Sequence, residues 1–344
     1  MHLYPLIRPL TFALDAETAH RAAIKALKLM PPRRPPDFPA SLKTRVAGID
    51  FATPIGLAAG FDKDAEVPEQ MLSFGFGFVE VGTLTPRAQE GNSRPRLFRL
   101  SEDRAVINRM GFNNGGQPAA YGRLQFDLRF PGVIGVNIGA NKDSADRIAD
   151  YVSGVRAMAP VAKYLTINIS SPNTPGLRQL QDEGALKALL SAIYEARPKR
   201  GPPIFLKVAP DLGEGEPDQI VRVAIQHGVD AIIVSNTTVS RPPLKSRYAY
   251  EQGGLSGAPL KAPALKMLQE FRSASGGEMP LIGVGGIATA EDAWERIRAG
   301  ASLIQLYSAM VYDGPGIARR MANGLAALLK REGYANIADA VGSG

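Results

Sequence analysis

Short runs of β-branched and other apolar residues recur along the chain from Thr53 onward, and most are separated by stretches with helical periodicity. The apolar runs predict eight strands, at Ile55–Ala59, Phe78–Gly82, Val133–Ile138, Tyr164–Ile169, Ile204–Val208, Ala231–Val234, Leu281–Val284 and Leu303–Leu306. The helical stretches include Ala145–Met158, Ala185–Ala196, Pro217–His227, Pro263–Phe271 and Ala290–Ala299. Eight such units in about 290 residues predict an α/β fold, a (β/α)8 TIM barrel. An open doubly wound sheet would instead carry its nucleotide motif after an early strand.

Two further segments are predicted to complete the barrel. The stretch 45–53 is expected to form a small hairpin that closes the barrel floor, and the connection 235–256 is long enough to be a lid. We therefore expect one barrel domain over residues 41–344.

The N-terminal segment, residues 1–40, has a different pattern. One helix face is indicated by apolar residues spaced three or four apart, namely Leu3, Leu6, Ile7, Leu10 and Leu14. Pro5 and Pro9 predict that this helix is short or broken, and Asp15 is expected to cap a second helix from Ala16 to about Met30. The pair could lie in the plane of a membrane surface or pack as a hairpin on the barrel, and the pattern leaves both open. No run of roughly 18 to 20 apolar residues predicts a bilayer-spanning helix.

Composition narrows the possible chemistry. The chain has no cysteine, which excludes disulfides, thiolate nucleophiles, iron–sulfur clusters and cysteine zinc sites. The three histidines, His2, His20 and His227, are too scattered for a HExxH-type site, so we expect no metal. His227 is expected to have a structural role at the end of a helix. The net charge of +7 is compatible with nucleic acid, anionic lipid or anionic ligands.

Small or hydrogen-bonding residues gather at the predicted C-terminal ends of the strands, where barrel enzymes place their chemistry. In strand order they are Ala59-Gly60-Phe61-Asp62-Lys63, Thr83, Asn137, Asn168, Lys207, Ser235-Asn236-Thr237, Gly285-Gly286 and Tyr307-Ser308. The last two groups fall where barrels commonly bind phosphate. Gly257 would let a ligand approach the backbone in the same way, or act as a hinge of the lid.

Lys207 stands out because the rest of its strand is apolar. A buried lysine needs a partner, so an anionic or electron-rich ligand is indicated, such as a reduced flavin. A Schiff base or a structural ion pair would also explain it, and Lys63 is a second candidate. Four amides, Asn108, Asn168, Asn173 and Asn236, would suit a planar, amide-rich ligand with a carboxylate, such as a pyrimidine.

Several longer runs resemble the class 2 (quinone-dependent) dihydroorotate dehydrogenases. They are 56–63 (GLAAGFDK), 108–114 (NRMGFNN), 168–178 (NISSPNTPGLR), 253–257 (GGLSG), 283–287 and 305–308. The resemblance covers nearly the whole chain and implies a barrel that binds FMN. It also implies oxidation of dihydroorotate to orotate in pyrimidine biosynthesis, with a hydride passing to FMN and a membrane quinone accepting the electrons.

The resemblance also implies roles for individual residues. Ser171 is implied as the base, at the position where soluble class 1 enzymes use cysteine, with Thr174 or a water relaying the proton. The implied FMN contacts are Ala59, Gly60, Phe61, Asp62, Lys63, Thr83, Asn137, Asn168, Lys207, Ser235, Gly257, Gly286, Tyr307 and Ser308. The implied substrate contacts are Lys63, Asn108, Arg109, Met110, Gly111, Phe112, Asn168, Asn173, Asn236 and Thr237. Ser235 replaces an expected threonine and Phe61 a more usual leucine.

For the N-terminal segment, the resemblance implies a helical hairpin that sits on the membrane and opens a tunnel for quinone. His20 and Arg99 would line the tunnel and Tyr307 would lie at its inner end, while Lys25, Lys28, Arg33 and Arg34 would favour anionic lipid. We expect a monomeric peripheral protein on the cytoplasmic face of a bacterial inner membrane, without a nucleic-acid partner. The rival interpretations are another FMN barrel, such as a class 1 enzyme or a dihydrouridine synthase, a Schiff-base aldolase, and a nucleic-acid binder.

Overall fold

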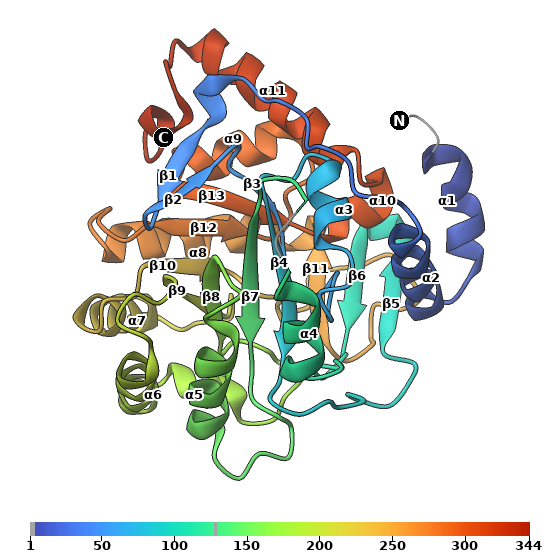
Figure 1. Ribbon diagram of the computed structural model, residues 1–344. Coiled ribbons are helices and arrows are strands. Elements are labelled where there is room, and N and C mark those ends of the chain that lie inside the picture. Colours follow the sequence, from blue (N-terminus) through green and yellow to red (C-terminus); the bar gives the residue numbers. More distant parts are fainter. Residues whose placement is uncertain (1–3, 127–128) are drawn as a thin grey trace.

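The computed structural model describes residues 4–126 and 129–344, and its centre is a closed barrel of eight parallel strands (Figure 1). In order around the barrel the strands are β3 (Ile55–Leu57), β4 (Phe78–Leu84), β7 (Val133–Ile138), β8 (Tyr164–Asn168), β9 (Ile204–Val208), β10 (Ala231–Val234), β12 (Leu281–Val284) and β13 (Ala301–Leu306). β13 pairs with β3 and closes the ring. Each predicted strand is present, with its bounds within two residues of those expected. The predicted TIM barrel is therefore confirmed.

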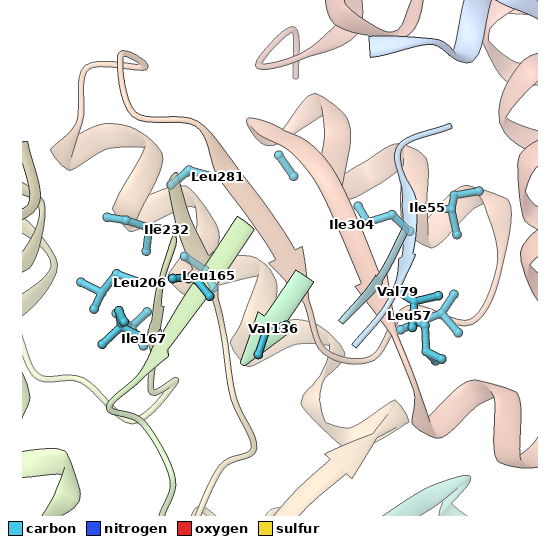
Figure 2. Close-up of a cluster of buried hydrophobic side chains, with 14 of the residues drawn as sticks. Ile55, Leu57, Val79, Val136, Leu165, Ile167, Leu206, Ile232, Leu281 and Ile304 are labelled. Atoms are coloured by element: carbon cyan, nitrogen blue, oxygen red, sulfur yellow. The ribbon is translucent and has the colours of Figure 1, made fainter. Parts of the chain in front are cut away.

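Side chains alternate between the two faces of the barrel wall. Outward-facing residues such as Leu57, Val136 and Ile232 pack toward the surrounding helices, as Figure 2 shows for part of this cluster. Inward-facing residues such as Phe78 and Phe205 form a second cluster inside the barrel. Both faces are apolar near the strands' N-terminal ends, which explains why the strands are continuous hydrophobic runs.

Helices cover the outside of the barrel. They are α3 (Pro68–Ser73), α4 (Gln117–Leu124), α5 (Arg147–Met158), α6 (Glu183–Ala196), α7 (Glu216–Gln226), α8 (Lys261–Ala274), α9 (Ala290–Arg298), α10 (Ser308–Asp313) and α11 (Ile317–Glu332). His227 caps the C-terminal end of α7, where its Nδ1 lies 2.9 Å from the carbonyl oxygen of Val223. The structural role expected for His227 is therefore confirmed.

Two small sheets complete the barrel at its ends. β1 (Thr44–Val46) and β2 (Ile49–Phe51) form the predicted antiparallel hairpin, and Val46 and Phe51 join the apolar cluster inside the barrel floor. The other sheet was not predicted. It has the order β11-β6-β5, from β5 (Leu97–Leu100), β6 (Ala105–Asn108) and β11 (Gly254–Gly257). It joins the segment after β4 to the end of the long connection after β10.

The N-terminal segment forms two helices, α1 (Tyr4–Ala13) and α2 (Ala16–Lys28), beside β5 (Figure 1). α1 is short, one of the two outcomes predicted from the prolines, and it runs unbroken through Pro9. Pro9 lacks an N–H and removes one bond near the middle of a three-turn helix, which the remaining bonds tolerate. Asp15 caps α2 as predicted, accepting hydrogen bonds from the N–H groups of Glu17 and Thr18. Within the two described ranges, no helix is both long and apolar enough to cross a membrane.

Candidate active site

A cavity of about 690 Å³ extends from the inner faces of α1 and α2 to the C-terminal ends of the barrel strands. Small-molecule sites typically measure roughly 300–1,000 Å³. At one end the cavity is lined by Ile7, Ala19 and Ala23 of the helices, and at the other by Lys207 and Ser171. The space could therefore hold ligands at both ends.

Most residues expected to contact FMN line this cavity. They are Ala59, Gly60, Phe61, Lys63, Thr83, Asn168, Lys207, Ser235, Gly257, Gly286, Tyr307 and Ser308. Two expected contacts do not line it. The buried Asp62 carboxylate accepts hydrogen bonds from the N–H groups of Glu66 and Val67, so it shapes the loop after β3. Asn137 lies behind Thr83, whose hydroxyl donates to its Oδ1 at 2.6 Å.

The residues expected to contact the substrate also converge, with one difference. The cavity is lined by Asn108, Met110, Gly111, Phe112, Asn173, Asn236 and Thr237, beside Ser171. Arg109 does not line it, because its guanidinium turns toward Glu251 at 2.7 Å and the Pro95 carbonyl at 2.8 Å. Arg109 therefore braces the surrounding loops.

A chain of hydrogen bonds connects the polar groups at the strand ends. Asn236 Nδ2 donates to the Ser170 hydroxyl at 2.9 Å, and that hydroxyl donates to Asn168 Oδ1 at 2.8 Å. Asn168 Nδ2 donates to the Thr83 hydroxyl at 3.0 Å. Asn168 and Asn236 are thus members of one connected network, whereas Asn173 Nδ2 donates separately to the Asn108 carbonyl at 3.2 Å. These bonds restrict how each amide can present itself to a ligand.

Both lysines of the site are shielded from solvent, Lys207 fully and Lys63 in part. Burial lowers the pKa of Lys63 to about 8, against the opposing effect of Asp64 and Glu17. Burial also lowers the pKa of Lys207, and the negative charge of Glu80 opposes that shift. Lys63 donates a hydrogen bond to the Gly60 carbonyl. A ligand carrying negative charge near either ammonium group would favour its charged form.

Ser171 follows β8 and is 5% exposed. Its hydroxyl oxygen accepts a hydrogen bond from the Asn173 N–H at 3.3 Å. Thr174, three residues further along the chain, is also buried.

Arg178 holds the loop that carries Ser171, a role that sequence reasoning missed. Its guanidinium donates to the Ser170 carbonyl at 3.1 Å, to Asp211 at 2.9 Å and to the Thr237 carbonyl at 3.1 Å. The loops after β8, β9 and β10 therefore share one cation. The arginine lies in the 168–178 run, but its spacing alone gives no sign of this role.

Close packing of two loops explains the glycines at the expected phosphate position. A Cβ on Gly286, whose φ is +70°, would stand 2.4 Å from the Lys261 Cα. A Cβ on Gly257, whose φ is +93°, would stand 2.4 Å from the Arg104 carbonyl oxygen. The Ser256 and Ser308 hydroxyls lie 2.7 Å apart beside them. This glycine-walled, hydroxyl-bearing end fits a phosphate, and Lys207 with its neighbouring amides fits a flavin ring, so the donor set is that expected for FMN.

Aromatic residues line the cavity where α2 approaches the barrel. His20 Nδ1 lies 3.3 Å from the Tyr307 hydroxyl, and the His20 ring meets the Phe61 ring edge to face at 5.4 Å. Burial holds the pKa of His20 well below its ordinary value, and the nearby charges of Lys63 and Arg21 add to the shift. Arg99 lines the cavity and donates to the Thr11 carbonyl at 2.8 Å. The three expected tunnel residues therefore border the cavity.

Two buried charged groups beside this region were also missed. Glu17 lies on a helix turn that looks solvated in sequence, yet it pairs with the buried Arg96 at 2.7 Å. Glu80 lies inside the barrel with no exposed surface. The signal that singled out Lys207, a charge in an apolar strand, is equally present at Glu80.

Comparisons with known proteins agree with this site. The family model for dihydroorotate dehydrogenase matches residues 41–329. The dihydroorotate dehydrogenase (quinone) of Erythrobacter litoralis is 64% identical over 341 residues, covering 99% of each chain. That of Sphingopyxis alaskensis is 62% identical over 344 residues, covering 99% of this chain and 97% of the relative. The ligand-free crystal structure of the Eimeria tenella enzyme superposes with a TM-score of 0.91 at 41% identity, covering 96% of this chain and 99% of that one. This chain belongs to the dihydroorotate dehydrogenase family, in its quinone-dependent class.

Proposed function

We propose that this chain oxidises (S)-dihydroorotate to orotate in de novo pyrimidine biosynthesis, with Ser171 as the base, FMN as its cofactor and a membrane quinone as the electron acceptor. The observation that carries the proposal is the continuity of the cavity. Ser171, Lys207 and the asparagines border one end, and the inner faces of α1 and α2 border the other. Two substrates that never meet can therefore react in turn at one cofactor between them.

FMN would be held by the residues at the strand ends. Lys207, Thr83 and Asn168 would bind its ring, and Gly257, Gly286 and Ser308 would surround its phosphate. When bound, FMN supplies a hydride acceptor for dihydroorotate and a two-electron donor for the quinone.

Ser171 would remove the proton at C5 of dihydroorotate as the hydride leaves C6. Burial excludes water from its hydroxyl, and Lys63 supplies positive charge for the substrate carboxylate. Asn108, Asn173 and Asn236 would orient the substrate amides, since each can both donate and accept. Thr174 or a water would carry the proton away from Ser171.

Residues 1–40 would form the membrane-associating segment and residues 41–344 the catalytic domain. Large apolar side chains are exposed on the two helices and just after them: Leu6, Leu10 and Leu29 lie outside the cavity lining, whereas Ile7, Leu14 and Met30 also border the cavity. Lys25 is exposed beside them, whereas Lys28 is engaged with Glu66 at 2.9 Å. Lys25, Arg33 and Arg34 would attract anionic headgroups on the cytoplasmic face of a bacterial inner membrane. His20, Arg99 and Tyr307 would then border the path of the quinone to the flavin. We propose that the protein acts as a monomer.

The proposed activity is tested by anaerobic titration of the purified yellow protein. Dihydroorotate should bleach the flavin absorbance with formation of one orotate per flavin, and an added ubiquinone should restore the colour. Protein that is bleached but is recoloured by fumarate or NAD and not by quinone would place the chain in a different class. A colourless protein would contradict the proposal entirely.

The role of residues 1–40 is tested separately by their deletion. The truncated protein should still be bleached by dihydroorotate but should lose fast reoxidation by quinone. Unchanged quinone turnover would refute the tunnel, without bearing on the oxidation of dihydroorotate.

A further inference from the structure

Glu80 is a fully buried acid inside the barrel that no step described above uses. It lies in the middle of β4, where Val79 and Val81 belong to the apolar cluster between the barrel and the helices. Side chains alternate along a strand, so Glu80 faces the barrel interior together with Phe78. A buried carboxylate is costly unless its oxygens are hydrogen bonded.

Four neutral donors surround the Glu80 carboxylate. Oε2 accepts from the Tyr164 hydroxyl at 3.1 Å, the Thr166 hydroxyl at 3.1 Å and Gln305 Nε2 at 2.8 Å. Oε1 accepts from Asn137 Nδ2 at 2.7 Å. Convergence of donors on both oxygens is the pattern of an ionised carboxylate, which only accepts. Asn137 must therefore turn its NH₂ toward Glu80 and its oxygen toward the cavity side.

The orientation of Asn137 determines that of the groups above it. The Thr83 hydroxyl donates its proton to Asn137 Oδ1 at 2.6 Å. The Thr83 oxygen is therefore left to accept a hydrogen bond from Asn168 Nδ2 at 3.0 Å. Asn168 then points its Oδ1 at the Ser170 hydroxyl, which accepts from Asn236 Nδ2. Each bond in the chain thus donates in one direction, from Asn236 at the cavity to Glu80 in the barrel.

Glu80 also acts on Lys207 by charge. Lys207 is 5% exposed and lies two residues after the inward-facing Phe205 on β9, so it faces the same barrel interior as Glu80. The charge of Glu80 favours the protonated form of Lys207 against burial. A charge placed near the flavin ring alters the relative stability of its oxidised and reduced forms. Glu80 therefore offsets part of the positive field that Lys207 applies to that ring.

We infer that Glu80 is a positioning residue for the site: its carboxylate fixes the direction of the hydrogen bonds from Asn236 through Asn168 to Asn137, and it balances the charge of Lys207. This inference rests on the proposed binding of FMN and dihydroorotate. A neutral amide at position 80 could donate as well as accept, so it would no longer impose one direction on the chain. It would also leave Lys207 without its counter-charge.

The test is the variant Glu80→Gln, with Tyr164→Phe as the matched control. Both changes alter the same group of hydrogen bonds, but only the first removes the charge and touches the bond to Asn137. Two quantities are measured on the flavin-loaded proteins: the midpoint potential of the flavin, and the Kd of orotate from the change in flavin absorbance.

For Glu80→Gln we expect the midpoint potential of the flavin to rise by at least about 30 mV. For a two-electron couple this is a tenfold shift toward the reduced form relative to the wild type. Orotate should bind about tenfold more weakly, because the amides no longer hold one orientation. Tyr164→Phe should stay within about threefold of the wild type in both quantities, since it removes one neutral hydrogen bond and leaves both the charge and the bond to Asn137 in place. If Glu80→Gln matches Tyr164→Phe, or changes only one quantity, the proposal is overturned.

Should Glu80→Gln fail to fold, Glu80→Asp keeps the proposal testable. Its shorter carboxylate retains the charge. The equilibrium between reduced and oxidised flavin, as read from the midpoint potential, should therefore stay within about threefold of the wild type. A tenfold shift in Glu80→Asp would show that charge is not the cause and would overturn the inference. Bleaching of the wild type by dihydroorotate tests the proposed function independently of either variant.

Discussion

The Glu17 carboxylate accepts two hydrogen bonds from the Arg96 guanidinium, at 2.7 Å and 3.0 Å, and both side chains are buried. Glu17 belongs to α2, whereas Arg96 belongs to the loop between β4 and β5. A further nitrogen of Arg96 donates to the Asn92 carbonyl at 2.7 Å, and the Asn92 amide donates to the carbonyl of Asn173 at 3.3 Å. The helical hairpin and the substrate loops are thus joined through one cation.

Replacing Glu17 by Gln should loosen this junction. Breaking a buried ion pair by removing one partner typically costs about 3–5 kcal/mol, because the other charge stays buried. We expect a lower thermal midpoint and a KM for quinone that rises by about tenfold, with a smaller change for a water-soluble electron acceptor. Arg94→Met is the control, because Arg94 contacts the same carboxylate at 3.0 Å but is 71% exposed. Equal effects of the two variants would show that burial of the pair does not matter.

Lys63 should produce an alkaline limb in the pH profile. Burial lowers its pKa to about 8, so the ammonium charge is present below that pH and is lost above it. Because the proposed contact of Lys63 with the substrate carboxylate needs this charge, kcat/KM for dihydroorotate should fall about tenfold per pH unit above about 8. Lys63→Arg should move the limb beyond the measurable range, since guanidinium stays protonated. A limb that persists unchanged in this variant would assign the titration to another group.

Arg178 should affect the dihydroorotate site more than the flavin site. Lysine cannot reproduce the three-way contact with Ser170, Asp211 and Thr237, so the Ser171 loop would lose its position. For Arg178→Lys we expect the KM for dihydroorotate to rise by about tenfold, with FMN content unchanged. Lys187→Met, which removes an exposed helix pair with Glu183, is a control that should leave KM as it is. Loss of FMN from Arg178→Lys would argue for a general structural role.

The exposed leucines of α1 should govern attachment to membranes. Leu6 and Leu10 are 73% and 72% exposed, so the double change to Glu should not disturb packing. Each of the two substitutions removes apolar surface from the bilayer and adds a negative charge that anionic lipid repels. We therefore expect binding of the protein to anionic vesicles to fall more than tenfold. Tyr250→Glu, at a residue 97% exposed, is the control. Vesicle flotation measures both, and equal binding by the leucine variant would exclude this face.

The barrel was predictable because each strand is a local apolar run between loop signals, and its two buried faces leave a clear pattern. The sheet of β11, β6 and β5 was not, since its pairing of Gly254 with Asn108 joins segments far apart in the chain. Glycines and amides at strand ends marked the candidate site correctly as a cluster. Burial of Glu17 had no sequence signal, because an acid in the first turn of a helix is usually solvated, and only its tertiary contact with Arg96 shows that its side chain is buried.

The most direct test of the account is the anaerobic stopped-flow reaction of Ser171→Ala. General base catalysis commonly contributes about 10²- to 10⁴-fold, so flavin reduction by dihydroorotate should slow by that factor. FMN should remain bound, and reoxidation of the reduced enzyme by quinone should keep its wild-type rate, because Ser171 lies at the end of the cavity away from α1 and α2. Full-speed reduction of the flavin in this variant would contradict the assignment of Ser171 as the base.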